Sequence, residues 1–526
     1  MKYDVLSDPL VHVEVDGELR HADLPQIFAL LCGDHELTFT ALQRHQHHPW
    51  HAFLVQLAAI AVTRGNGPKA LDEAPARDPE VWRQSLLRLT KKKREPWCLV
   101  VDDLGAPALL QPPVPERNLD GFKTELATPD ALDILLTTRN FDLKSQRMSD
   151  SEPEHWLFAL VAKQTFEGFS GRLNYGIARM NGGMSNRPCL AIAPSLSWGP
   201  RFRRDVRVWV EQRPAIAKEH GYDAKGHALL WLDPWDGSES LARSSLDPFF
   251  IEICRRIRLT DAEGRLAARM STSQIARIDA TDHAGHTGDI WTPVSTKKGA
   301  LASLTVPATG FTYRRLAELL FGEWTKPPAL EVRADDGREP MVIAQALVRG
   351  QGKTEGYHER IVPIPPKARG FFVKDESRRL GSRSVLWIDR AGKVRSGVLK
   401  FAVLTLLQGV REKNLDLRDA RADPWLERFE ARVDEHFFTT LFDTIDLDDA
   451  TSRGRWDAIL DEVAKQTFTE AAEEVPLPSV HRYPILAAAE GRFHGALRRV
   501  LAELYEGRAI AKPATMTTEE HDRAHP

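Results

Sequence analysis

Residues 166–188 read FEGFSGRLNYGIARMNGGMSNRP, a glycine-rich stretch that follows a segment of helical spacing from Trp156 to about Phe166. Glycine allows a backbone to approach a ligand closely and adopts positive φ angles, and Arg and Asn are side chains that contact phosphates and base edges. The stretch lacks the GxxxxGK[ST] spacing of a Walker phosphate loop. It therefore predicts a loop that approaches an extended polyanion, with an irregular surface loop as the alternative. Its glycines and polar residues are Gly168, Gly171, Gly176, Gly182, Gly183, Arg172, Asn174, Arg179, Asn181, Asn186 and Arg187.

A second glycine-spaced stretch, VRGQGKTEG, covers residues 348–356. Gln351 precedes Gly352 and lies between two basic residues, Arg349 and Lys353. A long amide between two cations suits insertion beside bases, with the cations on phosphates. An exposed turn is the alternative interpretation.

The first part of the chain mixes helical and strand patterns. Alternating apolar residues within 9–30 predict a hairpin, and apolar residues at helical spacing predict a buried helix from Pro49 to Thr63. This part reads as an irregular α+β domain over residues 1–370. Further strands are predicted at Val206–Glu211, Ala228–Leu232, Phe249–Leu259, Leu301–Val306 and Met341–Val348.

The pattern changes after Phe372, where long helical spacings take over. Helices are predicted over 396–412, from Asp423 (as N-cap) and Pro424 to Leu441, over 456–467 and over 486–504. Four such helices with short connections predict a four-helix bundle over residues 371–526. The fold class expected is α+β: a mixed N-terminal domain followed by this bundle.

Composition limits the classes of function. The formal net charge is −3, so nucleic-acid contacts would come from local patches. The four cysteines lie far apart without a CxxC pair, which disfavours a thiolate zinc site and a disulfide framework. The N-terminal residues lack a signal-peptide pattern, and no apolar run of 18 residues occurs. We expect a cytoplasmic protein without a membrane partner.

A histidine-rich segment supports an alternative function. His45, His47, His48 and His51 include an i, i+4 pair, but Pro49 interrupts it and no HExxH glutamate accompanies it. Packing at a helix entry is the favoured interpretation, and we predict no metal and no cofactor. The alternative is a metal-dependent nuclease that uses His45, His47 and His51 with a carboxylate such as Asp233.

The order of several segments resembles the CasA family, the large subunit of the type I-E CRISPR Cascade complex. That complex is an RNA-guided surveillance assembly. The segments that carry the resemblance are WHAFLVQL (50–57), PALLQPP (107–113), PDALDILLTTRNFDLK (129–144), the glycine loop at 168–183, GDIWTP (288–293) and the Gln351 region.

The resemblance implies particular site residues. Gly168–Tyr175 resembles the family's glycine loop and Gln351 its glutamine wedge, while Arg277 is the nearest candidate for its basic finger. The segment after Thr137 resembles the loop that meets the 5′ handle of the guide RNA, through Arg139, Asn140 and Lys144. The DNA-binding residues expected are Gly168, Gly171, Arg172, Asn174, Arg277, Arg349, Gln351, Gly352 and Lys353.

The family's role implies a protein that is not an enzyme. It reads the protospacer-adjacent motif of double-stranded DNA from the minor groove, helps open the duplex for R-loop formation, and passes it to a helicase-nuclease. Its partners are the other Cascade subunits, the guide crRNA, target DNA and the helicase-nuclease. Readout in the minor groove is degenerate, and opening costs a few kcal/mol per unstacked step. Phosphate contacts and guide–target pairing offset that cost. A purely architectural subunit that never touches DNA is a third possibility.

Overall fold

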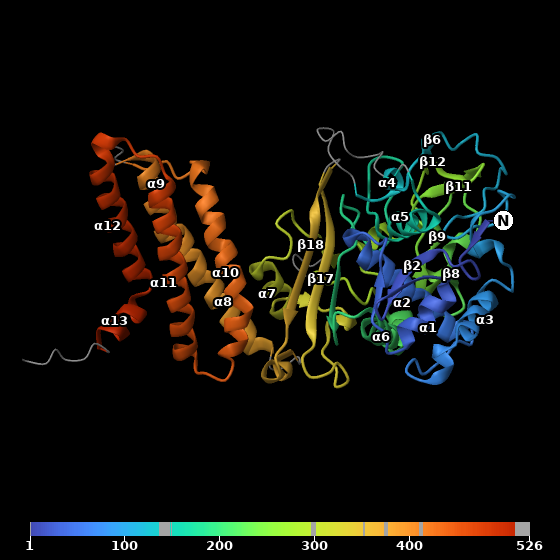
Figure 1. The fold of residues 1–526 in the computed structure, drawn as a ribbon, viewed down its shortest axis with the longest axis horizontal. Coiled ribbons are helices and arrows are strands. Elements are labelled where there is room, and N and C mark those ends of the chain that lie inside the picture. Colours follow the sequence, from blue (N-terminus) through green and yellow to red (C-terminus); the bar gives the residue numbers. More distant parts are fainter. Residues whose placement is uncertain are drawn as a thin grey trace, which may run out of the picture. The chain divides into compact units, whose positions relative to one another are not determined.

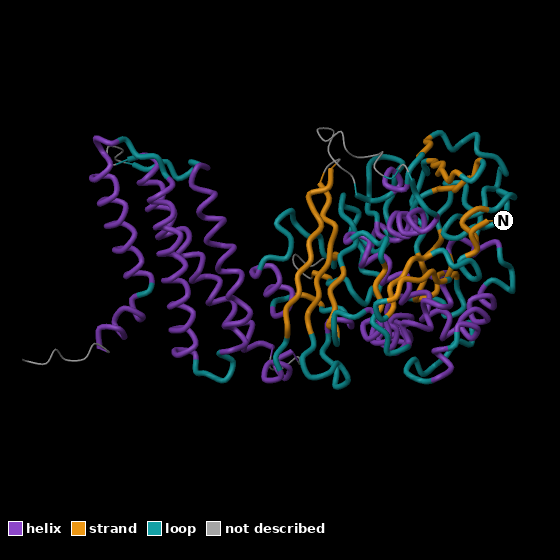
Figure 2. The backbone as a smooth tube through the Cα atoms, in the orientation of Figure 1, coloured by secondary structure: helices purple, strands orange, loops and turns teal. Residues whose placement is uncertain are grey.

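The computed structural model describes residues 2–135, 148, 150–295, 301–350, 353–372, 377–409 and 414–510. The chain forms two compact units, Met1–Val373 and Lys374–Pro526, and each is described by itself. Helices and strands mix in the first unit, and helices alone make up the described part of the second (Figure 1, Figure 2). The α+β fold class with C-terminal helices is confirmed.

The hairpin expected within residues 9–30 is present. β2 (Val11–Val15) pairs antiparallel with β3 (Glu18–Ala22) and with β4 (Leu37–Phe39). The chain then enters α1 (Leu24–Cys32), which begins where Asp23 accepts a hydrogen bond from the backbone of Gln26. A carboxylate at this position satisfies backbone donors that the first turn of a helix leaves free.

Two buried helices form the centre of the first unit. α2 (His47–Arg64) and α5 (Pro153–Phe166) pack against each other, and most of their residues are buried on every side. A helix that is apolar all round belongs in a core. Both helices confirm the sequence predictions for Pro49–Thr63 and Trp156–Phe166.

The predicted strand Val206–Glu211 is wrong, because these residues belong to the long helix α6 (Trp198–His220). Val206, Val208 and Val210 alternate with other residues and imitate the period of a strand. Phe202, Val206 and Trp209, however, are buried at helical spacing, and α6 packs against α1 and α2. The burial of this helical face determines the local structure.

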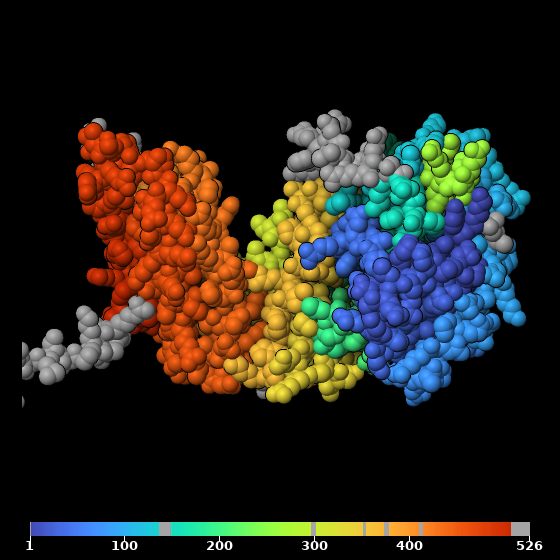
Figure 3. Space-filling view, viewed as in Figure 1, coloured from blue at the N-terminus to red at the C-terminus, as the bar shows by residue number. Residues whose placement is uncertain are grey.

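A three-stranded antiparallel sheet follows directly from the glycine-rich stretch. That stretch connects α5 to β7 (Cys189–Ala193), which pairs with β17 (Met341–Gly350). β17 also pairs with the edge strand β18 (Lys353–Pro363), from Met341 opposite Pro363 to Gly350 opposite Lys353. Part of β18 is exposed on the face of the first unit seen in Figure 3.

The other elements of the first unit are short. The predicted strand Phe249–Leu259 is divided into β10 (Leu246–Ile251) and β11 (Arg256–Ala262). Leu301–Val306 contributes only β15 (Ala302–Ser303), and Ala228–Leu232 only β8 (His227–Leu229). The remaining strands and helices are β1 (Lys2–Asp4), β5 (Cys98–Val100), β6 (Thr124–Leu126), β8 (His227–Leu229), β9 (Leu241–Ala242), β10 (Leu246–Ile251), β11 (Arg256–Ala262), β12 (Arg265–Ser271), β13 (Ile278–Asp279), β14 (Val294–Ser295), β15 (Ala302–Ser303), β16 (Trp324–Thr325), α3 (Pro79–Leu89), α4 (Pro129–Leu132) and α7 (Tyr313–Phe321).

The second unit is built from long helices that pack through aromatic pairs. The rings of Trp387 and Trp456 stack at 4.9 Å between centroids, and those of Phe468 and Phe493 at 4.3 Å. Its elements are α8 (Ser377–Lys393), a π-helical segment (Val394–Leu399), α9 (Lys400–Gln408), α10 (Asp423–Asp443), α11 (Asp449–Glu474), α12 (Arg482–Val500) and α13 (Ala502–Ile510).

Two details of the second unit differ from the sequence predictions. The first long helix begins at Ser377 rather than near 396, because the exposed Val385 and Leu386 obscure its apolar period. Asp423 is the first residue of α10, and Ala422 is its N-cap. In the described parts of both units, no helix has the length and apolar character needed to cross a bilayer.

Candidate nucleic-acid interface

The accessible tip of the glycine loop is a tight turn. Gly171 has φ +115° and Leu173 has φ 66°, and the backbone N–H of Asn174 donates to the carbonyl of Gly171 at 2.9 Å. A return bond from Ser170 N–H to the Asn174 carbonyl, at 3.0 Å, closes the turn. Arg172 is exposed, so Gly171, Arg172 and Asn174 lie where an outside ligand can reach them.

Other glycines of the loop serve packing. Gly168 is buried, and a Cβ there would lie 1.7 Å from the backbone carbonyl oxygen of Ser185. A Cβ on Gly176 would lie 2.3 Å from the carbonyl carbon of Gly168. Backbone atoms cannot move away as a flexible side chain can. The base of the loop therefore requires glycine for steric reasons, and Gly168 belongs to this base and not to the accessible tip.

A buried carboxylate anchors the base of the loop. Glu167 is fully buried and is surrounded by three cations. Its Oε1 lies 2.9 Å from Nζ of Lys163 and 3.0 Å from Nη1 of Arg349, and its Oε2 lies 2.8 Å from Nη2 of Arg255. Burial by itself raises the pKa of Glu167, but the cations more than offset it and lower this pKa to about 2. Glu167 is therefore a carboxylate at neutral pH.

This carboxylate joins the two loops singled out in the sequence. Glu167 precedes Gly168, and its carbonyl accepts a hydrogen bond from Ile177 N–H at 3.0 Å, which closes the glycine loop. Arg349 lies near the end of β17, one residue before the last strand residue, Gly350. The structure thus brings the base of the glycine loop to the end of the β17–β18 hairpin. A bond from the Asn186 amide to a carbonyl of β17, at 3.2 Å, adds a second link.

The hairpin end contains the predicted wedge. Gly350 pairs with Lys353 across the hairpin, so Gln351 and Gly352 connect the two strands. Gln351, Gly352 and the side chain of Lys353 lie outside the described residues, as do all of the predicted RNA contacts: Arg139, Asn140 and Lys144.

Two predicted DNA contacts are turned inward. Arg349 is 9% exposed and binds Glu167, so its guanidinium anchors the hairpin and is not offered to a phosphate. Arg277 is 5% exposed and donates to the carbonyls of Asp233 and Pro234 at 3.1 and 3.4 Å. Burial lowers the pKa of Arg277 to about 10. Neither arginine joins the tip of the glycine loop at the surface.

Two arginines of the opening stretch also serve the core. Arg179 pairs with Glu252 at 2.9 Å, and Arg187 binds both oxygens of Asp289 at 2.6 and 2.7 Å. All four side chains are buried, with none more than 2% exposed. These ion pairs fix the end of the stretch onto the fold, so the polyanion contact predicted for the stretch is confined to its tip.

The cluster around Glu167 was not predicted from the sequence. Lys163 and Glu167 have the i, i+4 spacing of a helical ion pair, which was a usable signal. Arg255 and Arg349 come from distant segments, and nothing in their local sequence marks them as partners of Glu167.

The histidines considered for a metal site face different partners. His45 Nε2 lies 2.9 Å from Oδ1 of Asp133, and His51 Nε2 lies 2.9 Å from Oδ2 of Asp205. The ring of His47 packs against a tryptophan of α6. Among the described residues, no cluster suited to a metal contains any of these histidines.

The carboxylate of the nuclease alternative is engaged elsewhere. Oδ2 of Asp233 lies 2.8 Å from Nδ1 of His227, the first residue of β8. Neither this contact nor the arrangement of the three histidines supports a nuclease site.

The chain has the fold of CasA, also called Cse1: a mixed unit around the buried α2 and α5, followed by a helical unit. The solved CasA (Cse1) of Thermus thermophilus is 16% identical, with a TM-score of 0.64, and the match covers 96% of this chain and 100% of that one. Cse1 of Acidimicrobium ferrooxidans is 15% identical, with a TM-score of 0.62 over 96% and 99% of the two chains.

Cse1 of Thermobifida fusca gives a similar match, 14% identical with a TM-score of 0.62 over 95% of this chain and 98% of that one. These likenesses confirm the resemblance at the level of the fold. No protein-family model and no curated protein matches the sequence.

Proposed function

We propose that this chain is the non-catalytic large subunit of a type I-E Cascade complex. In this role it recognises the protospacer-adjacent motif in duplex DNA and helps open the duplex for R-loop formation. The likeness to CasA structures over nearly the whole chain supports the proposal. The observation that carries it is the buried Glu167 cluster, which fastens the glycine loop and the β17–β18 hairpin to each other.

The two joined loops divide the work. The tip of the glycine loop at Gly171 approaches the minor groove, and the exposed Arg172 contacts a phosphate. Gln351 at the hairpin end separates the first base step. Unstacking costs a few kcal/mol per base step, so the segment that carries the wedge must be rigidly attached to the fold. The long β17–β18 ladder and the Arg349–Glu167 ion pair provide one.

The remaining parts of the proposal concern partners. Arg139, Asn140 and Lys144 contact the guide crRNA, and the chain binds the other Cascade subunits. The opened DNA passes to a helicase-nuclease, which performs the cleavage. The chain acts in the cytoplasm and needs no cofactor for motif recognition, because minor-groove readout and wedging use backbone, amide and cationic groups only.

Reconstitution tests this function. The purified chain is added to the remaining Cascade subunits and crRNA, and binding to a duplex with the correct motif is compared with binding to a scrambled motif. We expect motif-dependent binding only when the chain is present. Equal binding to both duplexes would assign the chain a purely architectural role, and cleavage by the chain alone in Mg²⁺ or Mn²⁺ would favour the nuclease.

A further inference from the structure

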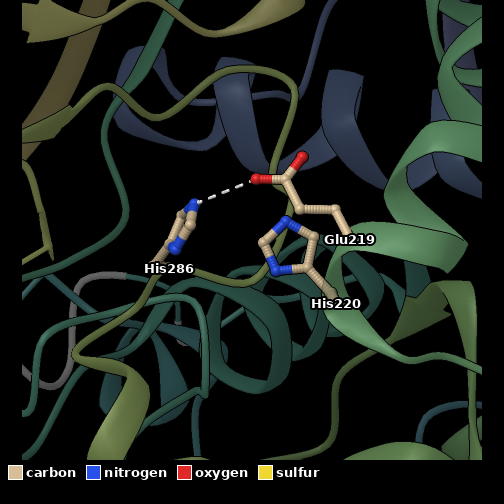
Figure 4. A group of neighbouring side chains, drawn as sticks. All are labelled: Glu219, His220 and His286. Atoms are coloured by element: carbon tan, nitrogen blue, oxygen red, sulfur yellow. Dashed lines mark ion pairs between the residues drawn. The ribbon is translucent and has the colours of Figure 1, made fainter.

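Three potential metal ligands meet at the end of α6. Glu219 and His220 are its last two residues, and His286 comes from the turn after Thr281–His283 (Figure 4). One ligand atom from each side chain lies within 4.8 Å of the others. Oε1 of Glu219 lies 3.9 Å from Nε2 of His286, and the two imidazole rings are 4.8 Å apart between centroids.

The turn that carries His286 is held in place. Gly285 and Gly288 have φ +80° and +77°, where other residues are strained. A Cβ on Gly285 would lie 2.2 Å from a serine hydroxyl of β15, and one on Gly288 would lie 2.6 Å from a side chain of α6. The hydroxyl of Tyr222 donates to the Thr287 carbonyl at 2.8 Å. His286 is therefore presented to α6 by a closely packed turn.

The two imidazoles are largely shielded from solvent. His220 is 4% exposed, and the side chain of His286 is 24% exposed. Burial lowers the pKa of His220 to about 4 and also lowers the pKa of His286. An imidazole binds a metal through the lone pair of a ring nitrogen, so each ring can supply one ligand atom.

Some charged groups around the site favour a bound cation and others oppose it. Glu219 supplies a negative charge, and the C-terminal end of α6 favours a cation. The positive charge of Arg243 lowers the pKa of both imidazoles and opposes a bound cation, and a protonated His283 acts in the same direction.

We propose that Glu219, His220 and His286 bind one divalent transition-metal ion, of which Zn²⁺ is the best fit. Two imidazole nitrogens and one carboxylate oxygen are a common zinc set, with solvent in the fourth position. Mg²⁺ and Ca²⁺ prefer oxygen ligands. The bound ion would join α6 to the His286 turn. The sequence prediction of no metal considered none of these residues, since His286 lies far from the other two in the chain.

A second group of candidate ligands is a weaker site. His12, Glu152 and Glu154 also gather, but Nδ1 of His12 lies 2.5 Å from Oε1 of Glu154. The other oxygen of Glu154 accepts the His12 backbone N–H at 2.9 Å. This carboxylate is already satisfied by the protein, so the group serves as an internal control.

Metal titration tests the site. The full chain, without an affinity tag and stripped with EDTA, is titrated with Zn²⁺ by calorimetry and with Co²⁺ by visible absorption. We expect one ion per chain and a rise in melting temperature with Zn²⁺. Glu219→Gln and His286→Gln should weaken binding by about tenfold or more, because each removes one of three ligands. Glu152→Gln and His283→Gln should bind as the wild type does.

Several outcomes would overturn the proposal. The wild-type chain could bind less than one equivalent at micromolar Zn²⁺, or Glu219→Gln and His286→Gln could retain wild-type affinity. Loss of binding in Glu152→Gln would move the site to the His12 group. Circular dichroism of each stripped variant ensures that lost binding is compared between folded proteins.

Discussion

Replacing Glu167 with Gln removes one negative charge and leaves Lys163, Arg255 and Arg349 around a neutral amide. The pKa of Glu167 falls from 4.5 to about 2 in the folded chain. At 1.36 kcal/mol per pKa unit, the ionised form contributes about 3 kcal/mol to folding. Loss of one partner of a buried ion pair has a similar cost, about 3–5 kcal/mol.

The loss can be expressed as a melting temperature. The unit Met1–Val373 contains the cluster, and an unfolding entropy of about 2.1 cal/mol/K per residue makes a loss of 3 kcal/mol a fall of about 4 °C. Calorimetry of the purified chain at pH 7 measures it.

Acid provides an independent check on the same carboxylate. Because its folded pKa is depressed, its stabilisation is complete above about pH 4.5, the ordinary value, and is lost as the pH falls towards about 2. The difference in stability between wild type and Glu167→Gln should therefore shrink across this range. A difference that stays constant down to pH 2 would show that ionisation of Glu167 contributes nothing.

The functional effect separates anchoring from general destabilisation. We expect Glu167→Gln to weaken motif-dependent DNA binding of the reconstituted complex by about tenfold, because the wedge and the glycine loop lose their common anchor. Asp336→Asn is the matched control: Asp336 is fully buried and pairs with Arg204, a residue of α6. Equal DNA binding by the two variants, at comparable losses of stability, would refute the anchoring role.

Three further substitutions probe the two loops. Gly171→Asp should weaken DNA binding at every motif variant, because it places a side chain and a negative charge at the tip. Mobility-shift titrations measure this affinity. Unchanged affinity would show that the tip is not part of the interface. Gln351→Ala should impair strand separation more than initial duplex contact, so normal R-loop formation on a relaxed target would count against the wedge. Gly168→Ala should destabilise the first unit by several kcal/mol, about the cost of a severe core clash, in urea unfolding. Gly121→Ala, where a Cβ meets nothing within 4 Å, is its control and should unfold at the wild-type midpoint.

Local sequence patterns correctly predicted helices whose apolar residues recur at helical spacing. The helices at Pro49–Thr63 and Trp156–Phe166 follow directly from such spacing, as α2 and α5 show. The pattern failed for α6, where alternating valines imitate a strand although tertiary packing selects a helix. Sequence period alone does not indicate which neighbour a residue packs against.

The candidate interface was less predictable than the fold. Glycines at 168 and 171 look alike in the sequence, but one avoids a clash in the core and the other forms the exposed tip. The sequence likewise does not indicate that Arg179 and Arg187 are engaged in ion pairs, because their partners Glu252 and Asp289 lie far away in the chain. Long-range ion pairs of this kind arise from tertiary structure, and no local motif encodes them.

The inward-facing arginines affect how the protein would search for a target. The chain has 71 Lys and Arg residues, yet the guanidinium of the buried Arg277 donates to two backbone carbonyls inside the fold. No ion pair with a carboxylate accompanies Arg277 among the described residues, so its burial removes one cation from the surface without removing an acid. Non-specific affinity for DNA depends on phosphate-neutralising surface cations. In the proposed function, the burial of this cation lowers the salt dependence of non-specific DNA binding by about one phosphate contact.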